Sequence, residues 1–266
     1  MKKQKRKKIN NHIGRAIAVA NQKGGVGKTT TTVNLAAALA EGKCDVLVVD
    51  LDPQGNATSG FGIDKNSVEH TIYELLLGSA AFDDVLVKTS FDHLYVLPAN
   101  IQLSGAEIDL LDIKDREFLV RNILEEQKGR FDFVLIDCPP SLNMLTINAM
   151  TAADTVLVPI QCEYYALEGL SQLIHSVNLI RQKLNPKLVL EGVVFTMYDS
   201  RNNLSKEVVE NVQQNLNENI YKTIIPRNVR LAEAPSYGMP ITEYAPDSTG
   251  AEAYRQLALE MVAHEM

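Results

Sequence analysis

The chain has 266 residues, of which 45% are hydrophobic and 22% charged, a composition typical of folded globular proteins rather than disordered or fibrous ones. Its net charge is −7, and because α/β chains of about 200 to 250 residues often fold as one unit, we expect a single acidic domain over residues 15–266. Cys44, Cys138 and Cys162 show no metal-ligand or C-x-x-C spacing, which favours a reducing compartment and argues against disulfides, a zinc site or an iron–sulfur cluster.

Residues 1–14 form a basic N-terminal tail that we expect to be disordered. The segment KKQKRKK supplies six of the 26 Lys and Arg residues. Without these six, 20 basic residues would face 33 acidic ones, a balance of −13. Any nucleic-acid contact must therefore come from a local patch or from the tail. A solvated tail and a DNA-contacting arm both fit such a block of like charge.

The sequence contains no sign of a membrane or export segment. No apolar run approaches the roughly 18 residues that cross a bilayer, and no apolar core of a signal peptide follows the basic stretch. We therefore expect a cytoplasmic protein.

Short apolar runs alternate with helical patterns along the chain, which is typical of βαβ units and a mostly parallel sheet. The runs are apolar on both faces, as expected for strands covered by helices on each side. We predict strands at 16–21, 45–50, 94–97, 131–137, 155–160, 188–196 and 222–225. We predict helices at 29–41, 101–111, 117–128, 166–184, 204–216 and 251–263. The predicted fold is an α/β domain with a twisted, mostly parallel sheet and helices on both faces.

A glycine-rich loop joins the first predicted strand to the first predicted helix. In NQKGGVGKTT, Gln22 stands at the first glycine position of the P-loop pattern, and Gly27, Lys28 and Thr29 match its last three fixed positions. Such a loop binds phosphate through backbone N–H groups and the positive end of the following helix. We expect Lys28 to reach the β- and γ-phosphates and the Thr29 hydroxyl to ligate Mg²⁺. Lys23 is unusual in this motif, and its alternative interpretation is a solvent-exposed loop lysine.

Two acidic strand ends fall where ligands bind in open α/β sheets. In VVDLDPQGNAT, Asp50 ends a strand, and Asp52 precedes a turn that we expect to carry its carboxylate toward the γ-phosphate. In FVLIDCPPSL, Asp137 ends an apolar strand, a Walker B pattern whose carboxylate holds Mg²⁺ directly or through water. Either residue alone could be a helix cap or turn former. Beside a P-loop, we predict Thr29, Asp52 and Asp137 as the metal-associated set.

These motifs resemble the ParA/Soj family of partition ATPases, which carry a variant Walker A motif and belong to the wider ParA/MinD group. The resemblance runs from about Ala16 to the C-terminus. It rests on KGGVGKTT, DLDPQGNAT, IDCPPSL, PIQCEYYALEGL and IPRNVRLAEAPSYGMPI. The last two are much closer to chromosomal Soj-type ParA than to MinD. The basic tail lies outside the resemblance.

The resemblance implies a P-loop ATPase that uses ATP and Mg²⁺ and forms an ATP-dependent sandwich dimer. Lys23 would cross the dimer to the partner's phosphates, and Asp52 would position or activate the attacking water. Lys23, Lys28 and Asp52 are thus the implied catalytic residues. The implied nucleotide contacts are Lys23, Gly24, Gly25, Val26, Gly27, Lys28, Thr29 and Thr30, with Pro226, Arg227 and Asn228 beside the adenine.

The resemblance also implies that the ATP dimer binds double-stranded DNA non-specifically on the nucleoid. A ParB/Spo0J-like partner at centromere sites would stimulate hydrolysis, on a chromosome or a plasmid. The matching basic positions are Arg201 and Arg230, with Arg227 and Lys206 as weaker matches. Residues 197–240 contain five basic and five acidic residues, so only folding and dimerisation could gather a basic stripe. Each arginine could instead be an ordinary surface or salt-bridge residue.

Three other functions share parts of this pattern. A MinD-like membrane ATPase needs a basic amphipathic C-terminal helix, but the ending AEAYRQLALEMVAHEM has an acidic balance. We interpret its Tyr254, Leu257, Leu259 and Val262 as core residues. A nitrogenase-reductase-like electron carrier needs paired cluster cysteines. A DNA-binding regulator without catalysis is disfavoured by the P-loop and acidic strand ends, and no helix-turn-helix segment precedes the P-loop.

Overall fold

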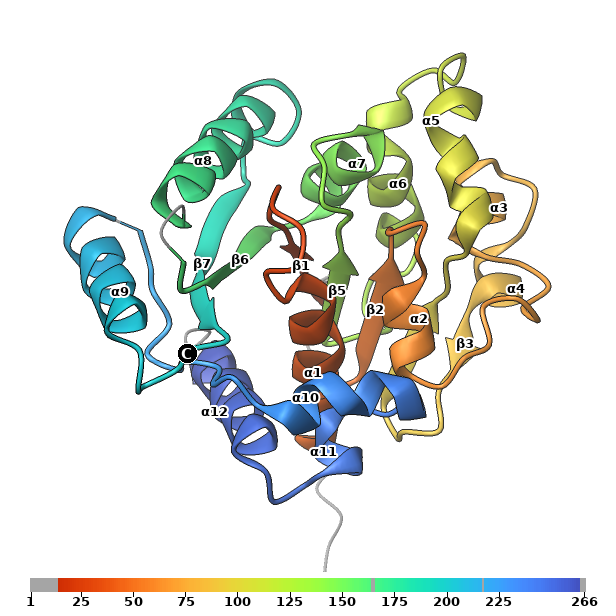
Figure 1. Ribbon diagram of the computed structural model, residues 1–266. Helices are drawn as coiled ribbons and strands as arrows, with labels where there is room; N and C mark the ends of the chain where they lie inside the picture. The colour runs from red at the N-terminus through yellow and green to blue at the C-terminus, as the bar shows by residue number, and fades with distance from the viewer. Residues whose placement is uncertain (1–13, 164–165, 217, 264–266) are drawn as a thin grey trace, which may run out of the picture.

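A parallel sheet forms the centre of the molecule (Figure 1). Within the residues that the computed structural model describes, 14–163, 166–216 and 218–263, seven strands lie in the order β3-β4-β2-β5-β1-β6-β7. They are β1 (Arg15–Val19), β2 (Val46–Asp50), β3 (Val87–Lys88), β4 (Leu94–Leu97), β5 (Phe133–Asp137), β6 (Thr155–Gln161) and β7 (Val189–Thr196). All neighbours pair in parallel except β3 with β4. Of the predicted basic tail, only Gly14 is among the described residues.

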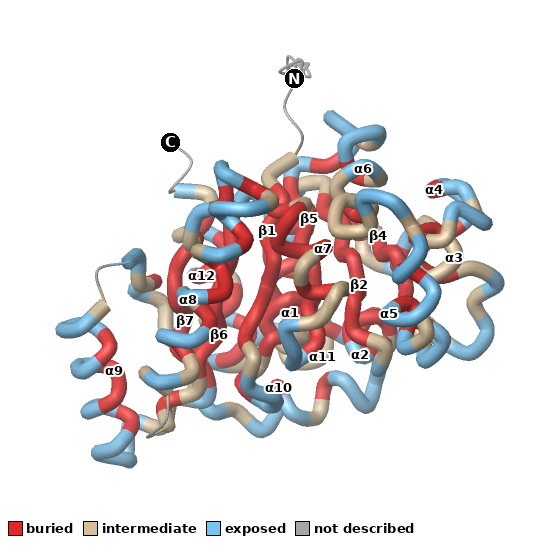
Figure 2. Tube along the Cα trace, turned by 90° about the horizontal axis from the view of Figure 1, so that it is seen from above, coloured by how far each residue is buried: buried red, intermediate tan, exposed pale blue. Residues whose placement is uncertain are grey.

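Alternate residues of the central strands face two apolar cores, one on each side of the sheet. In β1, Ala16 and Ala18 belong to one core, whereas Ile17 and Val19 belong to the other. The strands are accordingly buried along their length (Figure 2). This is the two-sided burial that the continuous apolar runs predict.

Helices from the middle of the chain cover one core, and helices from its beginning and end cover the other. The first core receives α3 (Ile72–Leu76), α4 (Phe82–Val85), η1 (Ile101–Gly105), α5 (Ala106–Asp109), α6 (Leu119–Glu125), α7 (Met144–Ala152), α8 (Ala166–Lys183) and α9 (Asn203–Asn215). The second receives α1 (Lys28–Glu41), α2 (Asn56–Gly60), α10 (Val229–Glu233), η3 (Ala234–Tyr237), α11 (Ile241–Tyr244) and α12 (Thr249–Ala263). The predicted architecture of a mostly parallel sheet with helices on both faces is confirmed.

The strand predicted at 222–225 is wrong. In its place the chain runs irregularly between two isolated bridges, Val193 with Ile220 and Tyr198 with Pro226. The Glu260 carboxylate of α12 accepts the backbone N–H of Lys222 at 2.7 Å and of Thr223 at 3.0 Å. A side chain therefore satisfies backbone donors that a strand ladder would have used.

The helices differ from the prediction in several places, and the short elements α2, α3, α4, α10, η3 and α11 were not predicted. The helix predicted at 101–111 is a 3₁₀ turn, η1, followed by one turn of α5, and the one predicted at 117–128 begins with the 3₁₀ turn η2 (Arg116–Phe118). Helix α7 was not predicted, because it is apolar on nearly all sides and lacks the polar stripe of a surface helix. In α12, Tyr254 and Leu257 are buried as expected, but Leu259 is 64% exposed and is not a core residue.

None of the helices in the described ranges is both long and apolar enough to pass through a membrane.

Candidate nucleotide-binding site

The loop between β1 and α1 has the backbone shape that its glycines predict. Gly25 and Gly27 have φ angles of 75° and 89°, in the left-handed region that favours glycine. A Cβ atom on Gly25 would meet no atom within 4 Å, so backbone conformation rather than space requires glycine there. Gly27 is the N-cap of α1, which starts at Lys28. The free N–H groups of the first helical turn therefore lie directly after the glycine loop.

Two buried polar side chains tie this loop to neighbouring strands. The Asn21 side chain accepts the Lys23 N–H at 2.9 Å and donates to the Pro159 carbonyl of β6 at 2.8 Å. The Thr196 hydroxyl at the end of β7 donates to the Val26 carbonyl at 2.8 Å. Sequence reasoning missed both anchors, since their partners lie more than a hundred residues away along the chain.

Lys28 lies inside the loop with only 6% of its surface exposed. Its Nζ donates to the Lys23 carbonyl at 3.0 Å. Burial lowers the pKa of Lys28, while Asp137, Cys138 and Asp52 oppose that shift. The structure thus confines a cationic group in the cradle formed by the glycines, where a phosphate would neutralise it.

Asp137 ends β5 and is completely buried under α1. One carboxylate oxygen accepts the Thr29 hydroxyl at 2.8 Å, and the other accepts the Thr32 hydroxyl at 2.9 Å. Burial raises the pKa of Asp137, and the carboxylate of Asp50 raises it further. Thr32 was not predicted, although its position three residues after Thr29 places both hydroxyls on one helix face.

The pairing of Thr29 with Asp137 fits a magnesium site. A hydroxyl and a carboxylate are oxygen donors of the kind that Mg²⁺ prefers, and Mg²⁺ usually completes its shell with water and substrate phosphates. A divalent cation beside Asp137 would also compensate the cost of burying its negative charge.

Asp52 lies in the turn after β2 and is 9% exposed. Its carboxylate accepts the Gln54 N–H at 2.9 Å, and its own N–H donates to the Asp50 carboxylate at 3.1 Å. Burial raises the pKa of Asp50, and the hydrogen bonds from Thr58 and Asp52 oppose the shift. Asp52 is therefore held in place by its own loop, close enough for its charge to act on Lys28.

Lys23 forms an ion pair that the sequence analysis did not predict. Its ammonium group forms an ion pair with Glu163, which follows β6 in the motif PIQCEYYALEGL. The two side chains are 44% and 41% exposed. Lys23 is thus at the surface, unlike Lys28.

The loop predicted beside the adenine lies next to the end of β7. Pro226 forms a bridge with Tyr198, and the Arg227 N–H donates to the Tyr198 carbonyl at 2.9 Å. Asn228 caps α10 by accepting the Arg230 N–H at 2.8 Å. Because the end of β7 also contacts the glycine loop, Pro226, Arg227 and Asn228 lie at the same edge of the sheet as the P-loop.

The three arginines predicted to contact DNA come from two neighbouring segments. Arg201 forms two hydrogen bonds with the Asp199 carboxylate, at 2.9 and 2.8 Å. These bonds lower the pKa of Asp199 to about 2, and the charge of Arg227 contributes to the shift. Arg230 pairs with Glu233 at 2.8 Å. Each of Arg201 and Arg230 thus carries an acidic partner, and the bridge between Tyr198 and Pro226 brings the segments that contain Arg201 and Arg227 side by side.

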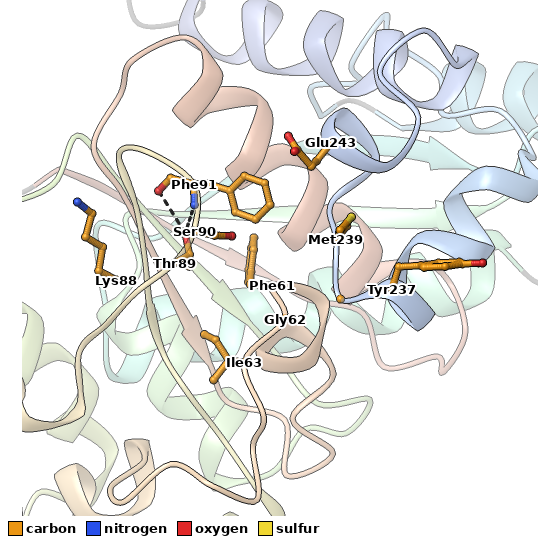
Figure 3. A pocket seen from close by; sticks show the side chains of 11 residues that line it. Phe61, Gly62, Ile63, Lys88, Thr89, Ser90, Phe91, Tyr237, Met239 and Glu243 are labelled. Atoms are coloured by element: carbon orange, nitrogen blue, oxygen red, sulfur yellow. Dashed lines mark hydrogen bonds between the residues drawn. The ribbon is translucent and has the colours of Figure 1, made fainter.

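A cavity of about 500 Å³ lies elsewhere, at the far end of α2 from Asp52. Phe61, Phe91 and Met239 face its centre, and Lys88 and Tyr237 lie at its edges (Figure 3). None of the residues predicted to bind nucleotide lines it.

Known proteins similar to this chain cover nearly all of it. Residues 14–190 match the family model described as an AAA domain. The chain is 54% identical over 252 residues to the sporulation initiation inhibitor protein Soj of Bacillus subtilis, covering 95% of this chain and 100% of that protein. It is 49% identical over 253 residues to the chromosome partitioning protein ParA of Myxococcus xanthus, covering 95% and 89% respectively.

Solved structures share the fold. Cobyrinic acid a,c-diamide synthase from Mycobacterium smegmatis, with bound ATP analog and magnesium, has a TM-score of 0.84 at 40% identity, over 95% of this chain and 96% of that one. The cell division ATPase MinD of Pyrococcus furiosus has a TM-score of 0.79 at 29% identity, over 94% and 99%. These likenesses confirm the predicted P-loop fold.

Proposed function

The chain belongs to the ParA/Soj family of chromosome-partitioning ATPases, and we propose that it is a nucleotide-driven switch that segregates or positions replicated DNA. It uses ATP and Mg²⁺. The observation that carries the proposal is the placement of Thr29 and Asp137, 2.8 Å apart, directly below a glycine loop that holds Lys28. We take the chromosome rather than a plasmid as the cargo, because the relatives above are named for chromosome partitioning or as Soj.

The residues of the site have different roles in nucleotide binding and hydrolysis. The backbone N–H groups of residues 24–30 and the Lys28 ammonium bind and orient the phosphates. Thr29 and Asp137 hold Mg²⁺, which when bound neutralises charge on the phosphate oxygens. Asp52 orients the attacking water. Pro226, Arg227 and Asn228 bind beside the adenine.

Dimerisation completes the site. Lys23 lies on the surface of the loop, from which it reaches the phosphates of a second copy in the ATP-bound state. Nucleotide state is then read out as oligomeric state. The dimer binds duplex DNA through Arg201, Arg227 and Arg230, and a ParB/Spo0J-like protein stimulates hydrolysis and resets it. Contacts to backbone phosphates make this binding independent of sequence and sensitive to salt.

Replacing Asp52 with Ala tests the assignment of the residue that positions water. We expect Asp52→Ala to bind ATP with little change but to lose hydrolysis by about 10²-fold or more, because the water is no longer oriented. The ATP dimer should consequently persist on DNA. Hydrolysis is measured as phosphate release and binding with a fluorescent nucleotide. A wild-type hydrolysis rate would show that another residue has this role.

Co-sedimentation tests the switch itself. The full chain is mixed with non-specific duplex DNA or with anionic liposomes, in ATP, ADP or no nucleotide, at two salt concentrations. We expect retention on DNA that requires ATP and falls with salt, and none on liposomes. Retention on liposomes instead would favour a MinD-like positioning ATPase.

A further inference from the structure

We propose that Asp50 and Thr58 are positioning residues that fix the loop carrying Asp52. The inference rests on the role proposed above for Asp52. Asp50 ends β2 and Thr58 lies in α2, so these residues enclose the turn in which Asp52 stands. Both are completely buried.

The Asp50 carboxylate closes this turn with three hydrogen bonds. One oxygen accepts the N–H of Asp52 at 3.1 Å. The other accepts the N–H of Thr58 at 2.8 Å and the Thr58 hydroxyl at 2.7 Å. Both carboxylate oxygens thus face donors of their own loop. Burying a carboxylate costs free energy unless its hydrogen bonds are made. Here the three hydrogen bonds all come from donors within one turn, so they stabilise the conformation of that turn.

Thr58 connects this turn to the segment that follows β4. Its hydroxyl donates to Asp50 and accepts the N–H of Ala99, just after β4, at 2.9 Å. Gly55 approaches the same point, since a Cβ atom on it would lie 2.5 Å from the Ala99 carbonyl oxygen. The turn is consequently fastened to β2 at one end and to the segment after β4 at the other.

This arrangement has a specific chemical requirement at position 58. The residue must both donate and accept through one side-chain oxygen, so Ser can replace Thr but the isosteric Val cannot. Thr58→Val leaves Asp50 with one donor fewer and the Ala99 N–H without its acceptor. The turn that holds Asp52 would lose its two-sided attachment while the P-loop remains intact.

The experiment compares Thr58→Val, Thr58→Ser and Asp50→Asn with the wild-type full chain. A matched control is Thr155→Val on β6, because the buried Thr155 hydroxyl makes no hydrogen bond within the described part of the chain. The readouts are kcat for hydrolysis of Mg²⁺-ATP, the Kd of a fluorescent ATP analogue and the thermal midpoint. We expect Thr58→Val to lower kcat about tenfold or more and change Kd by less than about threefold, because misplacement of a reacting group acts on the chemical step.

The Thr58→Ser variant distinguishes a role of Thr58 in positioning Asp52 from a role in stability alone. Thr58→Ser should return kcat to within about threefold of wild type, Asp50→Asn should resemble Thr58→Val, and Thr155→Val should change neither constant. A wild-type kcat in Thr58→Val, or equal losses in the Val and Ser variants, would overturn the inference. Asp52→Ala is measured in parallel. If that variant also hydrolyses ATP normally, the proposed function of Asp52 has failed; if only Thr58→Val is normal, the positioning inference alone has failed.

Discussion

The two lysines of the glycine loop, Lys23 and Lys28, lie in different environments. Lys28 is buried in its own phosphate cradle, whereas Lys23 is tied to Glu163 at the surface. Ion pairs between side chains this exposed contribute roughly 0 to 1 kcal/mol. The tie is therefore weak enough to be exchanged for the phosphates of a second copy. We infer that Glu163 holds Lys23 in the single chain and competes with dimer formation.

Substituting Glu163 with Gln tests this competition. Glu163→Gln removes the charge that holds Lys23, so the ATP-bound dimer should become tighter by up to about thirtyfold, because two such exposed pairs, each worth at most about 1 kcal/mol, are broken in every dimer. The dimer dissociation constant is measured by analytical ultracentrifugation in the Asp52→Ala background, with ATP. Glu125→Gln is the matched control, because its pair with Arg121 is equally exposed, at 42% for both side chains. An unchanged or weaker dimer in Glu163→Gln would contradict the idea.

Among the structural elements, the P-loop contains glycines that are required for two different reasons, backbone conformation and space for a second copy. Gly25 needs its left-handed backbone, whereas Gly24 is exposed and an added Cβ would lie 4.0 Å from its nearest neighbour, Pro140. A side chain at position 24 is thus compatible with the fold of the single chain. It would, however, protrude from the surface that a second copy must approach.

We therefore expect Gly24→Val to fold and bind ATP but fail to dimerise. Gly25→Ala is the comparison: it should weaken nucleotide binding by about 1–2 kcal/mol, the cost of a left-handed backbone at a residue with a Cβ. Nucleotide affinity and oligomeric state are measured for both variants. If Gly24→Val dimerises normally with ATP, the second copy does not approach through this part of the loop.

Strand β7 contains a bulge that only the structure reveals. The pairing of β6 with β7 shifts between Val156 and Leu157, which leaves Glu191 as the extra residue. Its carboxylate is buried, accepts the Tyr221 hydroxyl at 2.6 Å and pairs with Arg15 of β1. The adjacent Gly192 has a φ of 154°, and a Cβ atom there would lie 2.8 Å from the Asn219 side chain.

The bulge leaves no free space for a side chain at Gly192. Gly192→Ala should lower the free energy of unfolding by about 1–3 kcal/mol, because the methyl group meets neighbours that are fixed by the bulge. Gly169→Ala in α8 is the control: it has open space, and alanine favours the helix by roughly 0.5–1 kcal/mol. Urea denaturation measures both. Equal stability of Gly192→Ala and wild type would mean that the bulge adapts without cost.

At the scale of the whole molecule, an acidic protein must present a basic surface to DNA. The fold supports this by running the segment after β7, which contains Arg201, beside the segment before α10, which contains Arg227. The side chains of Arg201 and Arg230 are 87% and 59% exposed, so phosphates can reach these arginines and compete with their acidic partners at modest cost.

Arg201→Ala and Arg230→Ala should each weaken DNA retention about equally for unrelated sequences. Each should also lower the slope of log affinity against log salt by about 2 per bound dimer, as expected for the loss of one phosphate contact from each of its two copies. Arg121→Ala on α6, which packs on the other core, removes an exposed, paired arginine of the same kind and should leave binding unchanged. If the salt dependence stays the same in both test variants, DNA is bound by another surface.

The architecture and the phosphate loop could be predicted from the amino-acid sequence, because both depend on local patterns. Apolar runs covered on both faces predicted β1, β2, β5, β6 and β7, and the P-loop lies within a few consecutive residues. Lys28, Thr29, Asp52 and Asp137 could be named for the same reason: each belongs to a short motif with its own chemistry. The roles assigned to these four residues stay predictions, of which Asp52→Ala tests one.

The residues that support these motifs could be identified only from the folded chain. Thr196, Glu163 and Thr58 act through partners that are distant in sequence or specified by loop geometry, and no spacing rule connects them. The irregular path at 222–225 has the same origin, since the carboxylate of Glu260 from α12 replaces a strand neighbour. Local patterns encode burial and backbone preference, but hydrogen bonds between distant segments exist only once the chain has brought them together.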